Sequence, residues 1–172
     1  MPHINFEFKA RTNKLSLCED KLKQINPFFK GEDHQIDTYF NVLKGRLKLR
    51  EGNIENALIY YERENTNATR QSNVLLYQHE PAKGLKEILT NVHGVKTIVD
   101  KRRKIYFVNN VKIHFDEIAT LGTFVEVEAI DKDGNMNIEQ LKKQCDYFAD
   151  LFEIKARDYI AVSYSDMIAG DI

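Results

Sequence analysis

Three cationic side chains alternate along residues 45–50, which read Gly-Arg-Leu-Lys-Leu-Arg. Successive side chains of a β-strand point to opposite faces, so Arg46, Lys48 and Arg50 share one face and the two leucines share the other. Like charges at this spacing repel one another, and the pattern therefore indicates a polyanion held against that face. An edge strand kept soluble by its cations is the alternative interpretation, and repetition of the pattern on other strands distinguishes the two.

Other strand-like segments repeat this alternation and add carboxylates to it. Their charged faces carry Glu7, Lys9, Arg63, Lys101, Arg103, Lys112, His114, Asp116, Glu126 and Glu128. Cations exceed carboxylates in the combined set. Carboxylates bind hard cations such as Mg²⁺, and Arg and Lys bind phosphate oxygens. These residue types together predict a ligand with several negative charges and a divalent metal, of which a triphosphate is the simplest example.

The segments that must position these residues read as antiparallel strands. We expect strands over residues 5–9, 35–40, 45–50, 57–64, 97–108, 111–118 and 123–130. The dipeptide Asn109-Asn110 is typical of a two-residue hairpin turn, which would place Arg103 opposite Asp116 and Ile105 opposite His114. Residues 66–80 are polar and irregular, and we expect an excursion without regular structure there.

Three further segments have the periodicity of amphipathic helices. The first follows Ser16, which together with Glu19 fits a capping box, and the second covers residues 81–92. The third follows Asn137, which fits a capping box with Gln140. Each helix presents an apolar stripe that needs a partner.

Helices and strands together predict the fold class. The helices should cover the apolar faces of the strands, so the charged faces should point toward one another across a common interior. Unpaired charge is costly to bury in an ordinary sandwich core. We therefore predict an α+β fold in which a closed or nearly closed antiparallel β-barrel has a charged, hydrated interior and is covered by helices.

Length and composition narrow the class of protein. A chain of 172 residues with 42% hydrophobic content suits one domain over residues 1–172. The formal net charge of -1 gives no basic excess, which argues against a nucleic-acid surface. The sequence shows no signal peptide and no apolar run long enough to cross a bilayer, so we expect no membrane partner and a cytoplasmic location.

The motifs, in this order, resemble the CYTH superfamily of triphosphate tunnel enzymes, and within it the class IV adenylyl cyclase branch. The resemblance runs from residue 3 to about residue 166. It is carried by Glu7-Phe8-Lys9, Asp37-Thr38-Tyr39-Phe40, residues 45–50, Arg63, Lys101 with Arg103, His114-Phe115-Asp116, residues 121–128 and Ser163-Tyr164-Ser165-Asp166. The founding motif of the family is Glu-x-Glu-x-Lys. Here Asn5 stands at the first Glu, so a neutral amide oxygen replaces a carboxylate.

The resemblance implies a role for each of these residues. The catalytic residues would be Glu7, Lys9 and Arg103. The ligands of Mg²⁺ or Mn²⁺ would be Glu7, Asp116, Glu126 and Glu128. The phosphates would be bound by Lys9, Arg46, Lys48, Arg50, Arg63, Lys101, Arg103 and His114. Alternatives stay open, because Asp116 could pair with Arg103, His114 could be a structural hydrogen-bonding residue, and Glu126 and Glu128 could be solvated strand residues.

The resemblance also implies a reaction. A class IV cyclase converts ATP to cyclic AMP and pyrophosphate, whereas a triphosphatase with the same clamp would hydrolyse thiamine triphosphate, inorganic triphosphate or a nucleoside triphosphate. Because Asn5 replaces the first Glu of the motif, a module that binds triphosphate or polyphosphate without turnover is the third alternative. A scaffold without a ligand would leave the interior cations without counter-charge. Class IV cyclases further suggest a homodimer.

Overall fold

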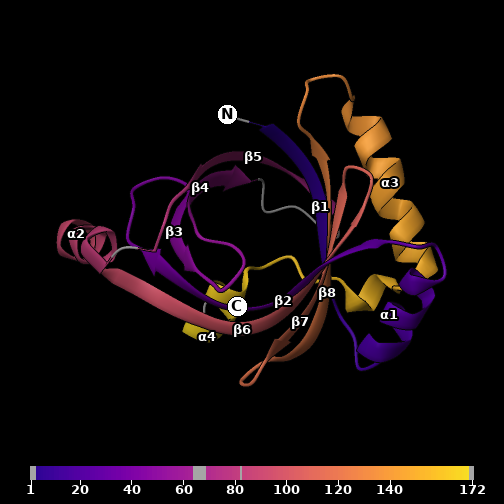
Figure 1. Cartoon of the computed structure of the whole chain (residues 1–172), viewed down its shortest axis with the longest axis horizontal. Coiled ribbons are helices and arrows are strands. Elements are labelled where there is room, and N and C mark those ends of the chain that lie inside the picture. Colours follow the sequence, from indigo (N-terminus) through magenta and orange to yellow (C-terminus); the bar gives the residue numbers. More distant parts are fainter. Residues whose placement is uncertain (1–2, 64–68, 82, 171–172) are drawn as a thin grey trace.

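A closed barrel of antiparallel strands forms the centre of the computed structural model (Figure 1). The structure describes residues 3–63, 69–81 and 83–170, without the side chains of His3, Arg63, Thr69 and Lys83. Within these ranges the strands are β1 (His3–Arg11), β2 (Phe28–Phe40), β3 (Arg46–Glu51), β4 (Ala57–Arg63), β5 (Thr69–Gln78), β6 (Val95–Val108), β7 (Val111–Ile118) and β8 (Gly122–Asp131). Their order around the barrel is β1-β5-β4-β3-β2-β6-β7-β8, and β8 pairs back with β1. The predicted α+β barrel fold is confirmed.

The strand register turns one face of every strand toward the barrel interior. In the β6–β7 hairpin, Arg103 lies opposite Asp116 and Ile105 opposite His114, as the dipeptide Asn109-Asn110 predicted. Asn109 has a φ of 53°, the left-handed conformation that a tight two-residue turn requires. Because neighbours across a ladder share a face, this register carries the charged residues of each strand into one common lumen.

Most of the buried apolar residues pack outside the barrel, between its wall and the helices. The largest buried cluster joins the outer faces of β1, β7 and β8 to the helices α1 (Leu15–Lys23) and α3 (Ile138–Leu151), with Phe8, Val127, Leu141 and Phe148 among its members. In Figure 1 the helix α2 (Lys83–His93) lies on the opposite side of the barrel, and its Leu89 belongs to a buried cluster with Phe40 and Leu49. Where these helices cover it, the wall therefore has an apolar outer face.

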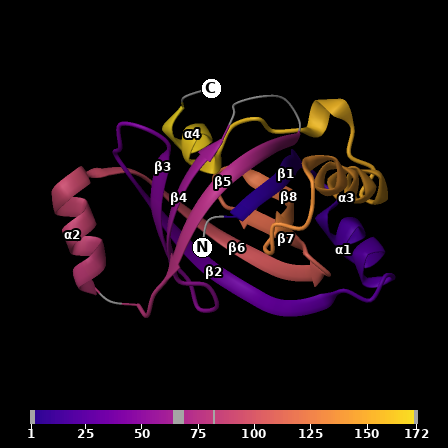
Figure 2. The same cartoon turned by 90° about the horizontal axis from the view of Figure 1, so that it is seen from above.

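One end of the barrel is closed by the C-terminal segment. A short 3₁₀ turn (Ala156–Asp158) leads to the helix α4 (Tyr164–Ala169), which lies along the upper rim of the barrel in Figure 2. Tyr164 packs there against Tyr39, Val99 and Phe124, whose side chains point into the barrel. None of the helices in the described ranges has the length and apolar character needed to span a bilayer.

The two predicted capping boxes have different outcomes. Asn137 accepts from the backbone N–H of Gln140 at 2.9 Å, and the Gln140 side chain accepts from the backbone of Asn137, so this box is confirmed. The box at Ser16 is wrong, because α1 begins at Leu15 and its N-cap is Lys14. Glu19 instead accepts hydrogen bonds from Tyr106 and Lys104 at 2.5 and 2.9 Å, which fixes α1 to the barrel.

The sequence analysis missed the first half of β2 and the whole of β5. β2 begins at Phe28 rather than at residue 35, with a register shift at Gly31. The expectation of an irregular segment over residues 66–80 is wrong for residues 69–78, which form β5; residues 66–68 lie outside the described ranges. In the first half of β5, Arg70 and Ser72 face the charged lumen. The other residues of this half point outward to solvent. The alternation of polar and apolar residues that predicts a strand is therefore missing.

Candidate active site in the barrel lumen

A cavity of about 1470 Å³ occupies the lumen. It extends from Ser163 and Tyr164 at the closed end to the β3–β4 loop that carries Glu55. The predicted site residues that line it are Glu7, Lys9, Lys48, Arg50, Lys101, Arg103, Glu126 and Glu128. Arg46, His114 and Asp116 are not among the residues that line the cavity, and the side chain of Arg63 is not described. The strand pattern thus brings most of the predicted set to one cavity.

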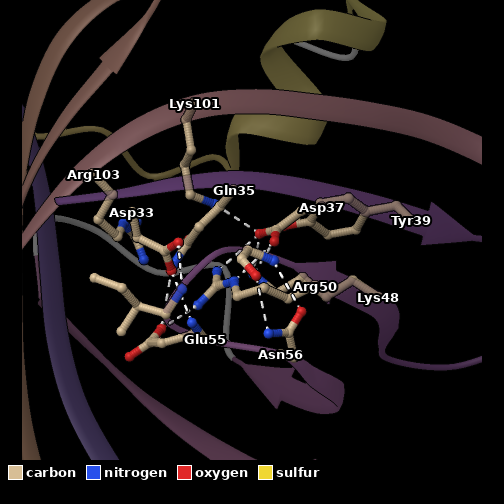
Figure 3. A network of polar contacts seen from close by, with 12 residues as sticks. Asp33, Gln35, Asp37, Tyr39, Lys48, Arg50, Glu55, Asn56, Lys101 and Arg103 are labelled. Atoms are coloured by element: carbon tan, nitrogen blue, oxygen red, sulfur yellow. Dashed lines mark hydrogen bonds and ion pairs between the residues drawn. The ribbon is translucent and has the colours of Figure 1, made fainter. Parts of the chain in front are cut away.

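Asp37 on β2 is the centre of the cationic part of the lumen (Figure 3). Its carboxylate is fully buried and accepts hydrogen bonds from Arg50 at 2.8 and 2.9 Å, from Lys101 at 2.7 Å and from Lys48 at 3.0 Å. Burial by itself raises the pKa of Asp37, but the charges of Arg50, Lys101 and Lys48 outweigh it and hold the pKa well below its usual range. One carboxylate on β2 therefore gathers three cations from the two strands that flank it, β3 and β6.

The cations around Asp37 exceed what this carboxylate can neutralise. Burial lowers the pKa of Lys101 well below its usual range; Asp37 opposes the shift, whereas Arg50 and Arg103 add to it. The shift reflects the cost of burying this ammonium beside other cations, which its 2.7 Å ion pair with Asp37 offsets only in part. An anion in the adjoining cavity would favour the charged form of Lys101.

Arg103 is held by Asp116, which Tyr164 holds in turn. Its guanidinium donates two hydrogen bonds of 2.6 Å to Asp116, and the phenol of Tyr164 donates to the same carboxylate at 2.7 Å. Both oxygens of Asp116 are thereby occupied by side chains. The geometry matches the alternative in which Asp116 pairs with Arg103, and it keeps Asp116 apart from the group of residues that could bind a metal.

A separate group of residues could hold a cation. Ligand atoms of His114, Glu126 and Glu128 lie within 4.8 Å of one another, and Glu7 is the cross-strand neighbour of Glu128. Burial and the adjacent charge of Glu126 raise the pKa of Glu128 to about 8. A divalent cation would relieve this repulsion, so the carboxylates fit Mg²⁺ or Mn²⁺.

His114 lies beside these carboxylates rather than at the cationic face. Its Nδ1 is 3.2 Å from Glu126, and the side chain is fully buried. Burial, reinforced by the charge of Arg103, lowers the pKa of His114 to about 3, so the imidazole is neutral at neutral pH. A neutral imidazole suits a metal such as Mn²⁺ better than it suits a phosphate.

Lys9 and Arg46 are also paired. Lys9 lies 3.2 Å from Glu126 and 3.8 Å from the centroid of the Tyr164 ring, which orients its ammonium toward the closed end of the lumen. Arg46 donates to Asp166 of α4 at 2.8 Å. Cations of the strands thus meet the C-terminal helix that closes the barrel.

Sequence reasoning missed three charged residues of the lumen. Asp37 belongs to a motif of the resemblance but was given no role in the site, and Arg70 lies in the segment taken for irregular structure, where it is within 3.3 Å of Glu7. Glu55 follows β3 in a loop and accepts from Lys112 at 2.5 Å and from Arg50 at 3.2 Å. Asp37 alternates with Gln35 and Tyr39 in the sequence, and that alternation is the one signal that could have placed it in the lumen.

The loop with Glu55 is fixed by a second buried carboxylate. Asp33 on β2 accepts hydrogen bonds from the backbone N–H groups of Ile54 and Glu55 at 2.9 and 3.0 Å, as Figure 3 illustrates for Asp33 and Glu55. These bonds aim the Glu55 carboxylate at the cations of the lumen. Burial raises the pKa of Glu55, but Lys112 and Arg50 reverse the shift and lower it. A loop carboxylate therefore occupies part of the cationic face of the lumen.

Comparisons with known proteins agree with this geometry. The chain resembles the PH1012 protein of Pyrococcus horikoshii, with a TM-score of 0.82 and 25% identity over 94% of this chain and 98% of that chain. It resembles a proposed adenylate cyclase of Vibrio parahaemolyticus, with a TM-score of 0.77 and 18% identity over 96% and 98% of the two chains. A Hippeastrum protein named as a proposed adenylyl cyclase with a dominant triphosphatase activity gives a TM-score of 0.64 and 14% identity over 98% and 96%.

These likenesses differ in what they establish. The last two structures are less than 25% identical to the chain and show the fold alone. Among curated protein sequences, no significant match is found. The model of the CYTH domain matches residues 3–160, which is most of the chain. The chain therefore belongs to the CYTH domain family, and this membership supports the prediction of an enzyme with metal-dependent phosphoryl chemistry.

Proposed function

We propose that the protein binds a triphosphate together with Mg²⁺ or Mn²⁺ in the barrel lumen and cleaves one of its phosphoanhydride bonds. The observation that carries the proposal is the convergence of Lys48, Arg50 and Lys101 on the single carboxylate of Asp37 beside a large cavity. Three cations fixed at hydrogen-bond distance from one point are preorganised for adjacent phosphate oxygens. A family that includes triphosphate enzymes makes such a ligand the simplest one.

The described side chains suggest a division of labour. Lys48, Arg50, Lys101 and Lys9 would contact phosphate oxygens, with Arg46 and Arg63 as further candidates from the resemblance, whereas His114 would join the metal-binding carboxylates. Glu7, Glu126 and Glu128 would hold the metal, which when bound supplies a Lewis acid for the developing charge on phosphate oxygens. Arg103 would stabilise charge on the leaving oxygens, and Asp116 would position Arg103.

The site is compatible with two reactions. In the cyclase reaction, the ribose 3′-hydroxyl of ATP attacks the α-phosphorus and pyrophosphate leaves; in the hydrolase reaction, water attacks the terminal phosphorus. Structures similar to the chain include proteins named for both activities. We favour the cyclase-like reaction as the first candidate and triphosphatase activity on thiamine, nucleoside or inorganic triphosphate as the second.

Asn5 keeps a non-catalytic binding module among the candidates. An amide is a weaker ligand for a hard divalent cation than a carboxylate, so the substitution lowers the expected metal affinity. The protein would then bind triphosphate or polyphosphate without turnover.

One experiment separates the enzyme from the binder. The protein is incubated with ATP, thiamine triphosphate or inorganic triphosphate in Mg²⁺ or Mn²⁺, and cyclic AMP, pyrophosphate and orthophosphate are followed together. Cyclic AMP with pyrophosphate supports the cyclase, and orthophosphate supports the hydrolase. Tight binding without product supports the binder, and Asn5→Glu then shows whether this residue is the cause. A protein that neither binds nor cleaves any of the three would contradict the proposal.

Three further expectations accompany this function. We propose that residues 1–172 act as one CYTH domain, that the protein is cytoplasmic and that it forms a homodimer. Gel filtration with light scattering tests the last of these. A monomer at micromolar concentration would contradict the homodimer without affecting the proposed chemistry.

A further inference from the structure

One sector of the lumen wall is apolar. Ala57, Ile59 and Tyr61 of β4 form a buried cluster with Val74 of β5, and all four line the cavity. Leu76, which follows on the same face of β5, also lines the cavity and leaves 38% of its surface exposed. This sector adjoins the cationic strand directly, because β3 and β4 pair side by side in the ring (Figure 1). A ligand made of phosphate alone would leave this apolar surface in water.

Two neutral polar residues border the apolar sector. Asn5 on β1 and Ser72 on β5 are cross-strand neighbours, with 5% and 2% of their surfaces exposed. Among the described residues, neither Asn5 Oδ1 nor Ser72 Oγ has a hydrogen-bond partner. Leaving such buried atoms unpaired destabilises a fold unless something else binds them. Both residues line the cavity, so a ligand there can reach them.

On β1 and β5 the inward residues change from charged to neutral. The inward face of β1 reads Lys9, Glu7 and then Asn5; that of the paired strand β5 reads Arg70, Ser72 and then Val74. Both series begin charged near the end closed by the C-terminal segment. Beside these two strands, the anionic part of a bound molecule would meet the charged residues and its neutral part would meet Asn5, Ser72 and Val74.

We propose that Asn5, Ser72, Ile59, Val74, Leu76 and Ile130, here called the neutral subsite, bind the organic part of the substrate. The substrate class is therefore an organic triphosphate that carries a ring system and hydroxyl or N–H donors, rather than inorganic triphosphate. The amide oxygen of Asn5 accepts a hydrogen bond from such a donor, and Ser72 can donate or accept one. The ring covers Val74 and Leu76. This inference rests on the proposed function and deepens it.

The position of Asn5 suggests a competing role in metal binding. It stands two residues from Glu7 on the same face, so its oxygen could accept from water bound to a cation instead. In that role Asn5 would affect every triphosphate equally, whereas the neutral subsite affects only ligands with an organic part. Ser72 and Leu76, on the other strand, distinguish the two roles further.

Calorimetric binding of ATP, thiamine triphosphate and inorganic triphosphate tests the inference. Ca²⁺ replaces Mg²⁺ to slow turnover, and chromatography confirms that the ligands stay intact. We expect at least one organic triphosphate to bind about tenfold more tightly than inorganic triphosphate. Leu76→Ala and Ser72→Ala should each lower the affinity for that organic triphosphate by about threefold to tenfold. The affinity for inorganic triphosphate should stay within about twofold of the wild-type value.

Leu75→Ala is the matched control. Leu75 is the neighbouring leucine on the same strand, points away from the lumen and is 51% exposed, so its truncation should change neither affinity. Equal binding of organic and inorganic triphosphate, or equal loss of both in the Leu76 and Ser72 variants, would overturn the inference and leave the proposed function standing. Failure of all three ligands to bind would overturn both.

Discussion

The guanidinium of Arg50 donates two hydrogen bonds, of 2.8 and 2.9 Å, to the buried carboxylate of Asp37. The two residues are cross-strand neighbours on β3 and β2, so the pair also fixes the register of these strands. Lys48 and Lys101 meet the same carboxylate. Asp37 therefore holds the cations of the candidate site in one place before any ligand enters.

Removing the charge of Asp37 should destabilise the fold. In Asp37→Asn the three cations keep their positions and lose their common counter-charge, which should lower the free energy of unfolding by about 3–5 kcal/mol. Urea denaturation at pH 7 measures the change. The control is Asp100→Asn, because Asp100 pairs with His34 at an exposed site and should contribute less than about 1 kcal/mol. Equal effects of both variants would contradict a central role for Asp37.

The same carboxylate should make stability depend on acid pH. The pKa of Asp37 is depressed in the folded state, so the unfolded state binds more protons once the pH falls below about 4. Its stabilising contribution is fully present above that pH and is lost as the pH falls toward the folded-state pKa. The free energy of unfolding should therefore fall more steeply below pH 4 in the wild type than in Asp37→Asn. Parallel curves would contradict the assigned shift.

Among the lysines, those that face the lumen should determine ligand affinity, and exposed ones should not. Lys48→Gln removes a cation that lines the cavity, and the loss of one charged hydrogen bond should weaken triphosphate binding by about tenfold to a hundredfold. Lys44→Gln is the control, because the Lys44 side chain is 78% exposed and pairs with Glu62 outside the lumen. Calorimetry measures both. Comparable losses would place the anion site elsewhere.

Affinity for the divalent metal should depend on Glu128. Glu128→Gln keeps the shape of the side chain and removes one carboxylate, so the protein should bind Mn²⁺ at least about tenfold more weakly in the presence of triphosphate. Glu117→Gln, on the outer face of β7, should bind Mn²⁺ as the wild type does. Electron paramagnetic resonance of free Mn²⁺ gives the affinities. Chelation with EDTA should abolish turnover in the wild type and in the control.

The apolar layer outside the wall should matter for stability and not for ligand choice. Phe148 on α3 is 3% exposed in the main apolar cluster, and Phe148→Ala should lower the free energy of unfolding by about 3–5 kcal/mol. The folded fraction should bind triphosphate with unchanged affinity. Tyr147→Ala, at a position that is 52% exposed, should cost much less stability. A change in triphosphate affinity in Phe148→Ala would show that the layers are coupled.

The alternation of residue types was sufficient to predict the inside-out barrel. Arg46, Lys48 and Arg50 share a face because a strand has a period of two, and this holds whatever the strand packs against. The hairpin turn at Asn109 was equally local, and it set the pairing of Arg103 with Asp116 correctly. β5 could not be found in this way, because Arg70 and Ser72 face a polar lumen and their neighbours face water.

Closure of the barrel decided what the charged residues do. Lys101 is 64 residues from Asp37 in the sequence, and only the pairing of β2 with β6 brings the two within 2.7 Å. The pairing of β1 with β5, which is also long-range, sets Asn5 beside Ser72 and next to an apolar wall that no local sequence pattern predicts. Side-chain periodicity fixes which face a residue occupies, whereas strand order and register fix its neighbours. The sequence by itself therefore determined a charged lumen, and the tertiary structure decided where within it cations, carboxylates and neutral groups meet.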